Sequence, residues 1–240
     1  MRKSIDDFLT KLEQQILDDL ESKHSKFKSK LVNLVQQMEK QTSPDDGCFV
    51  RNNIVAVTLG PTNETALVDV EKNQIIENIS LSHYCRGVAS DGKVLIISCG
   101  IASTMIVNLK DMSHTILYGV QTSRISIFQG HIYGTIWFEG KVSCYKSTGE
   151  LLWTFVSDDI KNPRGLTVDK NGFVYLTCEG NNNVVVVSQD GKTCKTILSE
   201  ADGIKHHREI DINRKTGTMI VSSRIGDNRS SYDSAFVYKI

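Results

Sequence analysis

Four arginines recur at nearly regular intervals, and their type and spacing suit ligand binding. They are Arg86, Arg124, Arg164 and Arg208, and each stands at the beginning of a short apolar segment. A guanidinium group binds phosphates and carboxylates through paired hydrogen bonds, so four of them brought together would form a site for an anion. The alternative is structural, because arginines at such positions also cap backbone carbonyls or pair with acids such as Asp169.

The other reactive side chains form no catalytic or metal-binding pattern. The sequence has no nucleophile-elbow, paired-glutamate or phosphate-loop motif, so we expect no enzyme, catalytic residue, cofactor or metal site. His206 and His207 are adjacent, without a carboxylate at ligand spacing, and are expected in a solvated turn. Trp153 and Phe155 alternate on one segment, which indicates packing between layers. The cysteines are isolated from one another, which favours free thiols over disulfides: Cys48, Cys85, Cys99, Cys144, Cys178 and Cys194.

The composition favours neither a nucleic-acid partner nor a membrane. The 240 residues include 28 basic and 28 acidic side chains, which gives a formal net charge of zero. This balance provides no overall attraction to polyanions, although a local basic face is still possible. The chain has no apolar run long enough to span a membrane, and no apolar signal core follows Met1. We therefore expect a cytoplasmic protein without a membrane partner.

The elements that position these side chains repeat about every forty residues. Glycines 60, 100, 140 and 180 each follow an alternating, β-branched segment, and turns such as Asn171-Gly172 are typical of two-residue hairpins. Expected second strands are 54–59, 94–98, 132–137, 174–178 and 219–223. Expected third strands are 66–70, 105–109, 142–145, 184–187 and 236–240, and fourth strands are 74–79, 115–120, 151–156 and 195–198.

Four antiparallel strands at a fixed repeat predict a mainly β fold, a β-propeller of about five four-stranded blades. We assign residues 48–240 to this domain and residues 43–47 to a linker. The fifth unit ends at its third strand, which leaves three possibilities: a five-blade ring, an open arc with exposed edges, or an incomplete six-blade propeller.

The first 42 residues follow a helical period. Apolar side chains recur every three or four residues without an interrupting proline or glycine, which predicts one long helix over 1–42. An apolar stripe of this length has to be buried, and we favour a coiled coil between chains over a helix packed on its own domain. The stripe consists of Leu9, Leu12, Ile16, Leu20, Phe27, Leu31, Leu34 and Met38.

The unit over 162–187 resembles the NHL repeat. It reads NPRGLTVDKNGFVYLTCEGNNNVVVV, and it departs from the family at Cys178 and Glu179, where an aspartate is usual. A long helix followed by such a propeller resembles the C-terminal half of tripartite-motif (TRIM) proteins of the NHL type. Relatives that act as ubiquitin ligases carry RING and B-box zinc modules, which this sequence lacks, so the resemblance implies no ligase activity here.

These observations predict a non-enzymatic interaction scaffold. We expect the helix to pair with a second copy or a related coiled-coil protein, as an antiparallel dimer if the resemblance holds, and the propeller face to bind a protein or peptide. Two alternatives stay open. One is RNA binding through the four arginines, since NHL propellers can recognise RNA or peptides on a basic face. The other is a RING-less regulator in a ubiquitin-ligase pathway.

Overall fold

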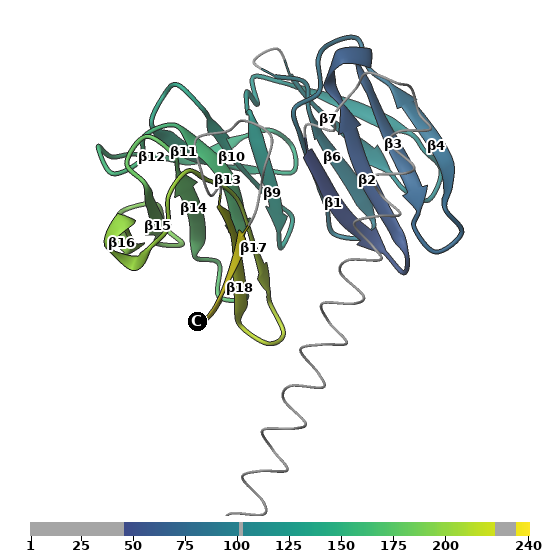
Figure 1. The fold of residues 1–240 in the computed structure, drawn as a ribbon. Coiled ribbons are helices and arrows are strands. Elements are labelled where there is room, and N and C mark those ends of the chain that lie inside the picture. Colours follow the sequence, from purple (N-terminus) through teal and green to yellow (C-terminus); the bar gives the residue numbers. More distant parts are fainter. Residues whose placement is uncertain (1–45, 101–102, 224–233) are drawn as a thin grey trace, which may run out of the picture.

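The computed structural model describes residues 46–100, 103–223 and 234–240, and the described chain forms five consecutive antiparallel sheets. The sheets are arranged around a common axis as the blades of a β-propeller (Figure 1). In each blade the strands lie side by side in chain order, and the first strand lies nearest the axis. The repeat read from the sequence is therefore confirmed as a β-propeller.

The bounds of the elements are as follows. Blade 1 contains β1 (Asp46–Arg51), β2 (Ile54–Leu59), β3 (Glu64–Asp69) and β4 (Gln74–Ser80). Blade 2 contains β5 (Gly87–Ser90), β6 (Val94–Ser98), β7 (Ser103–Asn108) and β8 (His114–Tyr118). Blade 3 contains β9 (Arg124–Phe128), β10 (His131–Ile136), β11 (Lys141–Lys146) and β12 (Leu151–Val156). Blade 4 contains β13 (Pro163–Val168), β14 (Val174–Cys178), β15 (Asn183–Val187) and β16 (Cys194–Leu198). Blade 5 contains β17 (His207–Asn213), β18 (Thr218–Ser223) and β19 (Ser234–Lys239), and two short 3-10 helices, η1 (Gly60–Thr62) and η2 (Glu200–Asp202), connect strands.

The core consists of apolar layers between successive blades. Alternate residues of each strand point to opposite faces, so each blade contributes side chains to the layers on both of its sides. Ile97 packs in the layer between blades 1 and 2, and Leu176 packs in the layer between blades 3 and 4; both are fully buried. The hairpin glycines Gly92 and Gly172 have φ values of 86° and 88°, a region in which glycine is favoured.

The blades form an arc that opens between its two ends. The strand β1 packs against β5, β5 against β9, β9 against β13, and β13 against β17. Among the described residues, β1 and β17 do not pack against each other in this way. Of the three possibilities read from the sequence, the described chain corresponds to the open arc, with blades 1 and 5 beside the opening.

Four of the five blades have four strands and blade 5 has three, in agreement with the expected end of the fifth unit at its third strand. The predicted fold class needs correction in one respect. The described residues contain no α-helix, so the fold that they form is mainly β and does not include the long N-terminal coiled-coil helix that the prediction added. The helical stripe over 1–42, with Leu9, Leu12, Ile16, Leu20, Phe27, Leu31, Leu34 and Met38, lies outside the described residues. The propeller begins at Asp46, two residues before the predicted boundary.

A search of the described residues finds no helix that is both long enough and apolar enough to cross a membrane.

Candidate binding site in the central channel

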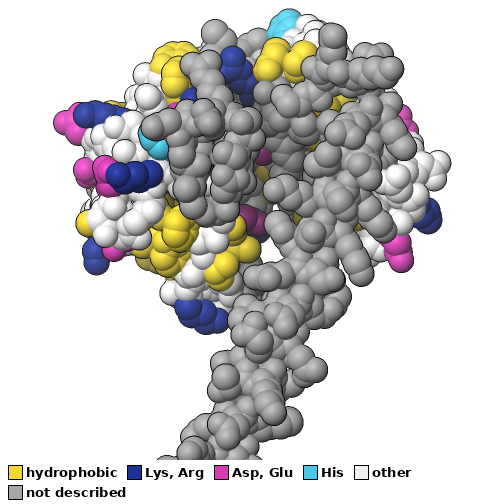
Figure 2. All heavy atoms as spheres, viewed as in Figure 1, with side chains coloured by type: hydrophobic (Ala, Val, Ile, Leu, Met, Phe, Trp, Pro, Cys, Tyr) yellow, Lys and Arg dark blue, Asp and Glu magenta, His cyan; other side chains and the backbone are white. Residues whose placement is uncertain are grey.

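A cavity of about 900 Å³ occupies the centre of the arc. Side chains from the first strand of every blade line it, and it reaches the opening between blades 1 and 5. In Figure 2, acidic side chains are visible near the middle of the view, between atoms of residues that are not described. The charged residues of the lining are balanced: Asp46, Glu209 and Asp211 against Arg124, Arg214 and Lys215.

Arg124 connects four blades at one end of the channel. It is the first residue of β9 in blade 3, and its side chain is 16% exposed. Its Nε donates a hydrogen bond to the carbonyl of Arg164 at 2.7 Å, and Nη1 donates to the carbonyl of Arg86 at 2.8 Å. Its Nη2 lies 3.4 Å from the carboxylate of Glu209 in blade 5. The backbones of Arg86 and Arg164 lie within hydrogen-bonding distance of Arg124, so Arg124 binds the protein's own backbone.

The other predicted arginines also have partners within the fold. Arg164 pairs with Glu179 at 2.7 Å, and its guanidinium lies 4.8 Å from the centre of the Trp137 ring. Arg86 lies over the ring of Tyr84 at 5.4 Å. Arg208 is half-buried on β17 and also interacts with another group of the protein. The structural alternative for the four arginines therefore describes this end of the channel better than a set of free anion ligands.

A fifth arginine, which the sequence did not single out, has the same role at the opposite end. Arg214 directly follows β17 and donates from Nε to the carbonyl of Val168 at 2.7 Å and from Nη2 to that of Ile127 at 3.1 Å. Its guanidinium lies 5.0 Å from the centre of the Phe128 ring. Burial lowers the pKa of Arg214, with Asp211 and Asp169 acting in the opposite direction. The inner strands are thus tied together at both ends of the channel.

Glu209 is the titratable group most affected by the channel. Its side chain is half exposed and lines the channel, where surrounding protein atoms disfavour the charged form of the carboxylate. This burial, together with the carboxylate of Asp46, raises the pKa of Glu209 to about 8, while Arg124 opposes the shift.

Replacing Glu209 with glutamine is expected to change how stability depends on pH. The pKa of Glu209 is about 8 when folded, against an ordinary value of 4.5, so the folded chain holds a proton that the unfolded chain has released. Stability from this group is therefore present below 4.5 and is lost as the pH rises towards 8. Urea unfolding across this range should show Glu209→Gln gaining stability relative to the wild type as the pH rises. Glu77→Gln, on the exposed strand β4, is the control, and an equal gain there would contradict the assignment.

Two other expectations have different outcomes. His207 is not in a solvated turn: it is fully buried on β17, its Nε2 lies 2.9 Å from the carbonyl oxygen of Asn183, and burial lowers its pKa. No local pattern in the sequence indicates this burial, because it comes from the packing of β17 against β13 and β14. Trp153 and Phe155 pack against the layer between blades 3 and 4, as predicted.

All six cysteines are free thiols, and those at 85, 99, 144 and 178 are buried.

Comparison with known proteins shows a similarity of fold without a matching family or a matching curated sequence. Neither a family model nor a curated protein sequence matches the chain. Among solved structures, hydrazine synthase from Kuenenia stuttgartiensis matches with a TM-score of 0.61 and 12% sequence identity. The match covers 77% of this chain and 56% of that chain, so this chain spans little more than half of its neighbour's length. At this identity the similarity is one of fold alone.

Proposed function

We propose that this protein is a non-enzymatic scaffold that binds an extended segment of a partner protein in the channel and its opening between blades 1 and 5. The observation that carries the proposal is the cavity of about 900 Å³, which every blade lines and which stays accessible at the opening. A volume of this size lies within the range of ligand-binding clefts in proteins. Because the arc is open, a chain segment is able to enter the cavity between the two ends of the arc. In a closed ring, a segment would enter only through the two faces of the channel.

Apolar side chains at the opening supply a surface for such a segment. Phe49 on β1 is 63% exposed and Ile220 on β18 is 46% exposed, and both line the cavity. Ile220 lies directly opposite Val237 on β19, which is also exposed. Large apolar side chains left in contact with water on two facing elements are typical of protein interaction sites. Burying them would provide a favourable free energy for association.

The polar lining favours a peptide over RNA. An RNA-binding face needs cations that are available to phosphates. Here Arg124 and Arg214 donate to backbone carbonyls, while Glu209 and Asp211 place acidic groups beside them. A peptide backbone, with its alternating donors and acceptors, is better matched to this mixed lining.

The one thiol in the channel lining is poorly suited to nucleophilic catalysis. Cys48 lies on β1 within the lining, and burial raises its pKa well above the ordinary value, with Asp46 adding to the shift. A thiol reacts as the thiolate, so this group is unreactive at neutral pH. This supports a binding role over an enzymatic one.

Replacing the exposed apolar residues of the opening is expected to abolish capture of the partner. The full chain, the double variant Phe49→Ser/Ile220→Ser and the control Val156→Ser are each immobilised and exposed to cell extract treated with nuclease. Val156 is 67% exposed on the outer strand β12, so it matches the apolar change away from the channel. We expect the same protein to be retained by the wild type and the control and to be lost with the double variant.

Two results would overturn the proposal. Equal retention by all three proteins would place the binding surface elsewhere. Loss of the captured protein from the wild type after nuclease treatment would show that RNA mediates the contact, which is the alternative function.

A further inference from the structure

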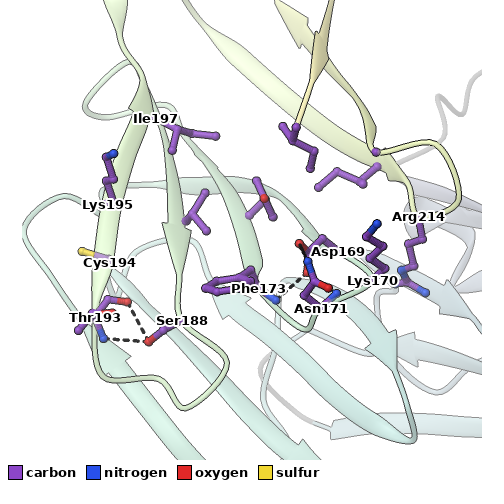
Figure 3. Close-up of a pocket in the computed structure, with 15 residues that line it drawn as sticks. Asp169, Lys170, Asn171, Phe173, Ser188, Thr193, Cys194, Lys195, Ile197 and Arg214 are labelled. Carbon is purple, nitrogen blue, oxygen red and sulfur yellow. Dashed lines mark hydrogen bonds between the residues drawn. The ribbon is translucent and has the colours of Figure 1, made fainter.

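A second cavity, separate from the channel opening, lies between blades 4 and 5. It has a volume of about 420 Å³. The turn before β14 and the turn before β16 form one side, and the end of β17 with the beginning of β18 forms the other. Figure 3 shows Lys170 and Arg214 near one another at one end of the cavity, with Lys195 and Cys194 on β16 across from them.

The charges of this cavity are unbalanced. Lys170, Lys195 and Arg214 line it, whereas Asp169 is its one acidic side chain. The Asp169 carboxylate is held in place, because its Oδ1 accepts hydrogen bonds from the backbone N–H groups of Asn171 at 2.9 Å and of Phe173 at 2.8 Å. Asp169 and Asp211 both act on the charge of Arg214. Within the described part of the chain, the ammonium groups of Lys170 and Lys195 form no ion pair, so the positive charge that these residues leave without an ion-pair partner is that of the two lysines.

The wall between the two lysines is apolar. Phe173 projects into the cavity between them in Figure 3, and Ile197 stands beside Lys195 on the same strand. A cation at the edge of an apolar wall is suited to a molecule that has a negative group at one end and an apolar body. Free phosphate or a polyphosphate would leave this wall without a partner. The remaining apolar lining comes from Tyr175, Val186, Ile212 and Ile240.

We propose that this cavity binds a small organic acid with an apolar chain or ring. The carboxylate lies against Lys170 at the end of the cavity near Arg214, and the apolar body extends over Phe173 towards Ile197. Arg214 is held by the carbonyls of Val168 and Ile127, so it contributes positive charge from a fixed position. The two cavities share Ile212 and Arg214, but Lys170, Phe173 and Lys195 line this cavity alone, so ligand binding here is tested separately from partner binding in the channel.

Binding of octanoate to the full chain, measured by isothermal titration calorimetry, tests the proposal. Octanoate has both features of the proposed ligand, whereas octanol lacks the charge and acetate lacks the apolar chain. We expect octanoate to bind with a stoichiometry of one and the two reference compounds to bind at least about tenfold more weakly, because each loses one of the two contributions.

A charge-matched pair of variants locates the site. Lys170→Gln/Lys195→Gln removes two positive charges from the cavity, and both residues are exposed and unpaired, so the fold should be retained. Lys93→Gln/Lys110→Gln removes two charges from exposed positions on blade 2 and is the control. Octanoate affinity is expected to fall about tenfold or more in the first variant and to stay unchanged in the second.

Three outcomes would overturn the proposal. The first is an undetectable heat of binding for octanoate at millimolar concentration. The second is an octanol affinity equal to that of octanoate, which would show adventitious apolar binding only. The third is an equal loss of affinity in both double variants, which would show a nonspecific effect of net charge.

Discussion

Replacing Gly165 with alanine is expected to lower the free energy of unfolding by about 3 kcal/mol, because the added methyl group has no space between two inner strands. A Cβ atom on Gly165 would lie 2.7 Å from the carbonyl oxygen of Arg208 and 2.8 Å from the backbone nitrogen of Ile210. It would also lie 2.8 Å from Oγ1 of Thr177. Two of these neighbours are backbone atoms of β17, so that strand has to move.

The hydrogen bonds at Gly165 add to this cost. Its backbone N–H donates to Oγ1 of Thr177 at 2.7 Å, and that hydroxyl donates to the carbonyl of Arg208 at 2.7 Å. Moving β17 breaks this chain of bonds in a buried place, where a lost partner is costly. The glycine at this position is thus explained by the close approach of blades 4 and 5.

Urea denaturation followed by circular dichroism measures the effect, with Gly47→Ala as the control. A Cβ atom on Gly47 would lie 3.3 Å from the carbonyl oxygen of Ala56, and Gly47 is exposed on the strand β1. We expect this control to change stability by less than about 1 kcal/mol. Equal destabilisation by both substitutions would contradict the packing argument.

Replacing Arg124 with methionine is expected to cost about 3 kcal/mol, comparable with removing one partner of a buried ion pair. Methionine keeps the unbranched apolar stem of the side chain but leaves the carbonyls of Arg86 and Arg164 without their donor. Calorimetry should show a melting temperature lower by about 6 to 12 °C for a domain of this size. Arg124→Lys should restore only a small part of the loss, since one ammonium group cannot reproduce the planar fork.

Arg51→Met is the matched control for this measurement. Arg51 ends β1 with its side chain exposed, so its replacement should leave the melting temperature within about 2 °C of the wild type. Full recovery of stability in Arg124→Lys would contradict the assigned role, because it would mean that charge alone is required.

Local patterns in the sequence predicted the strands well. The expected segments 54–59 and 151–156 coincide with β2 and β12, and the expected end of the fifth unit at its third strand corresponds to β19. These elements depend on alternation and turn residues, which act over a few positions. The partners of the arginines could not be predicted in this way, because Arg124 donates hydrogen bonds to carbonyls 38 and 40 residues away in the sequence. A backbone carbonyl is present in every residue type, so the sequence does not mark these partners.

Features that depend on the arrangement of whole blades could not be read from the sequence. Arg214 follows a strand whose only pattern is apolar alternation, so nothing local distinguishes it from an exposed turn residue. The opening between blades 1 and 5 results from the angles that successive blades make with each other, which are set by twist and packing. The channel cavity follows from the same angles.

The open arc gives the domain the thermodynamic character of a short linear array. Each blade packs against blades adjacent in sequence, so blades 1 and 5 are each supported on one side only among the described residues. Arg124 and Arg214 connect blades 2 to 5 through hydrogen bonds, so blade 1 is the end unit expected to lose structure first. A partner held between blades 1 and 5 would contact both ends at once, so its binding would make blade 1 unfold together with the other four.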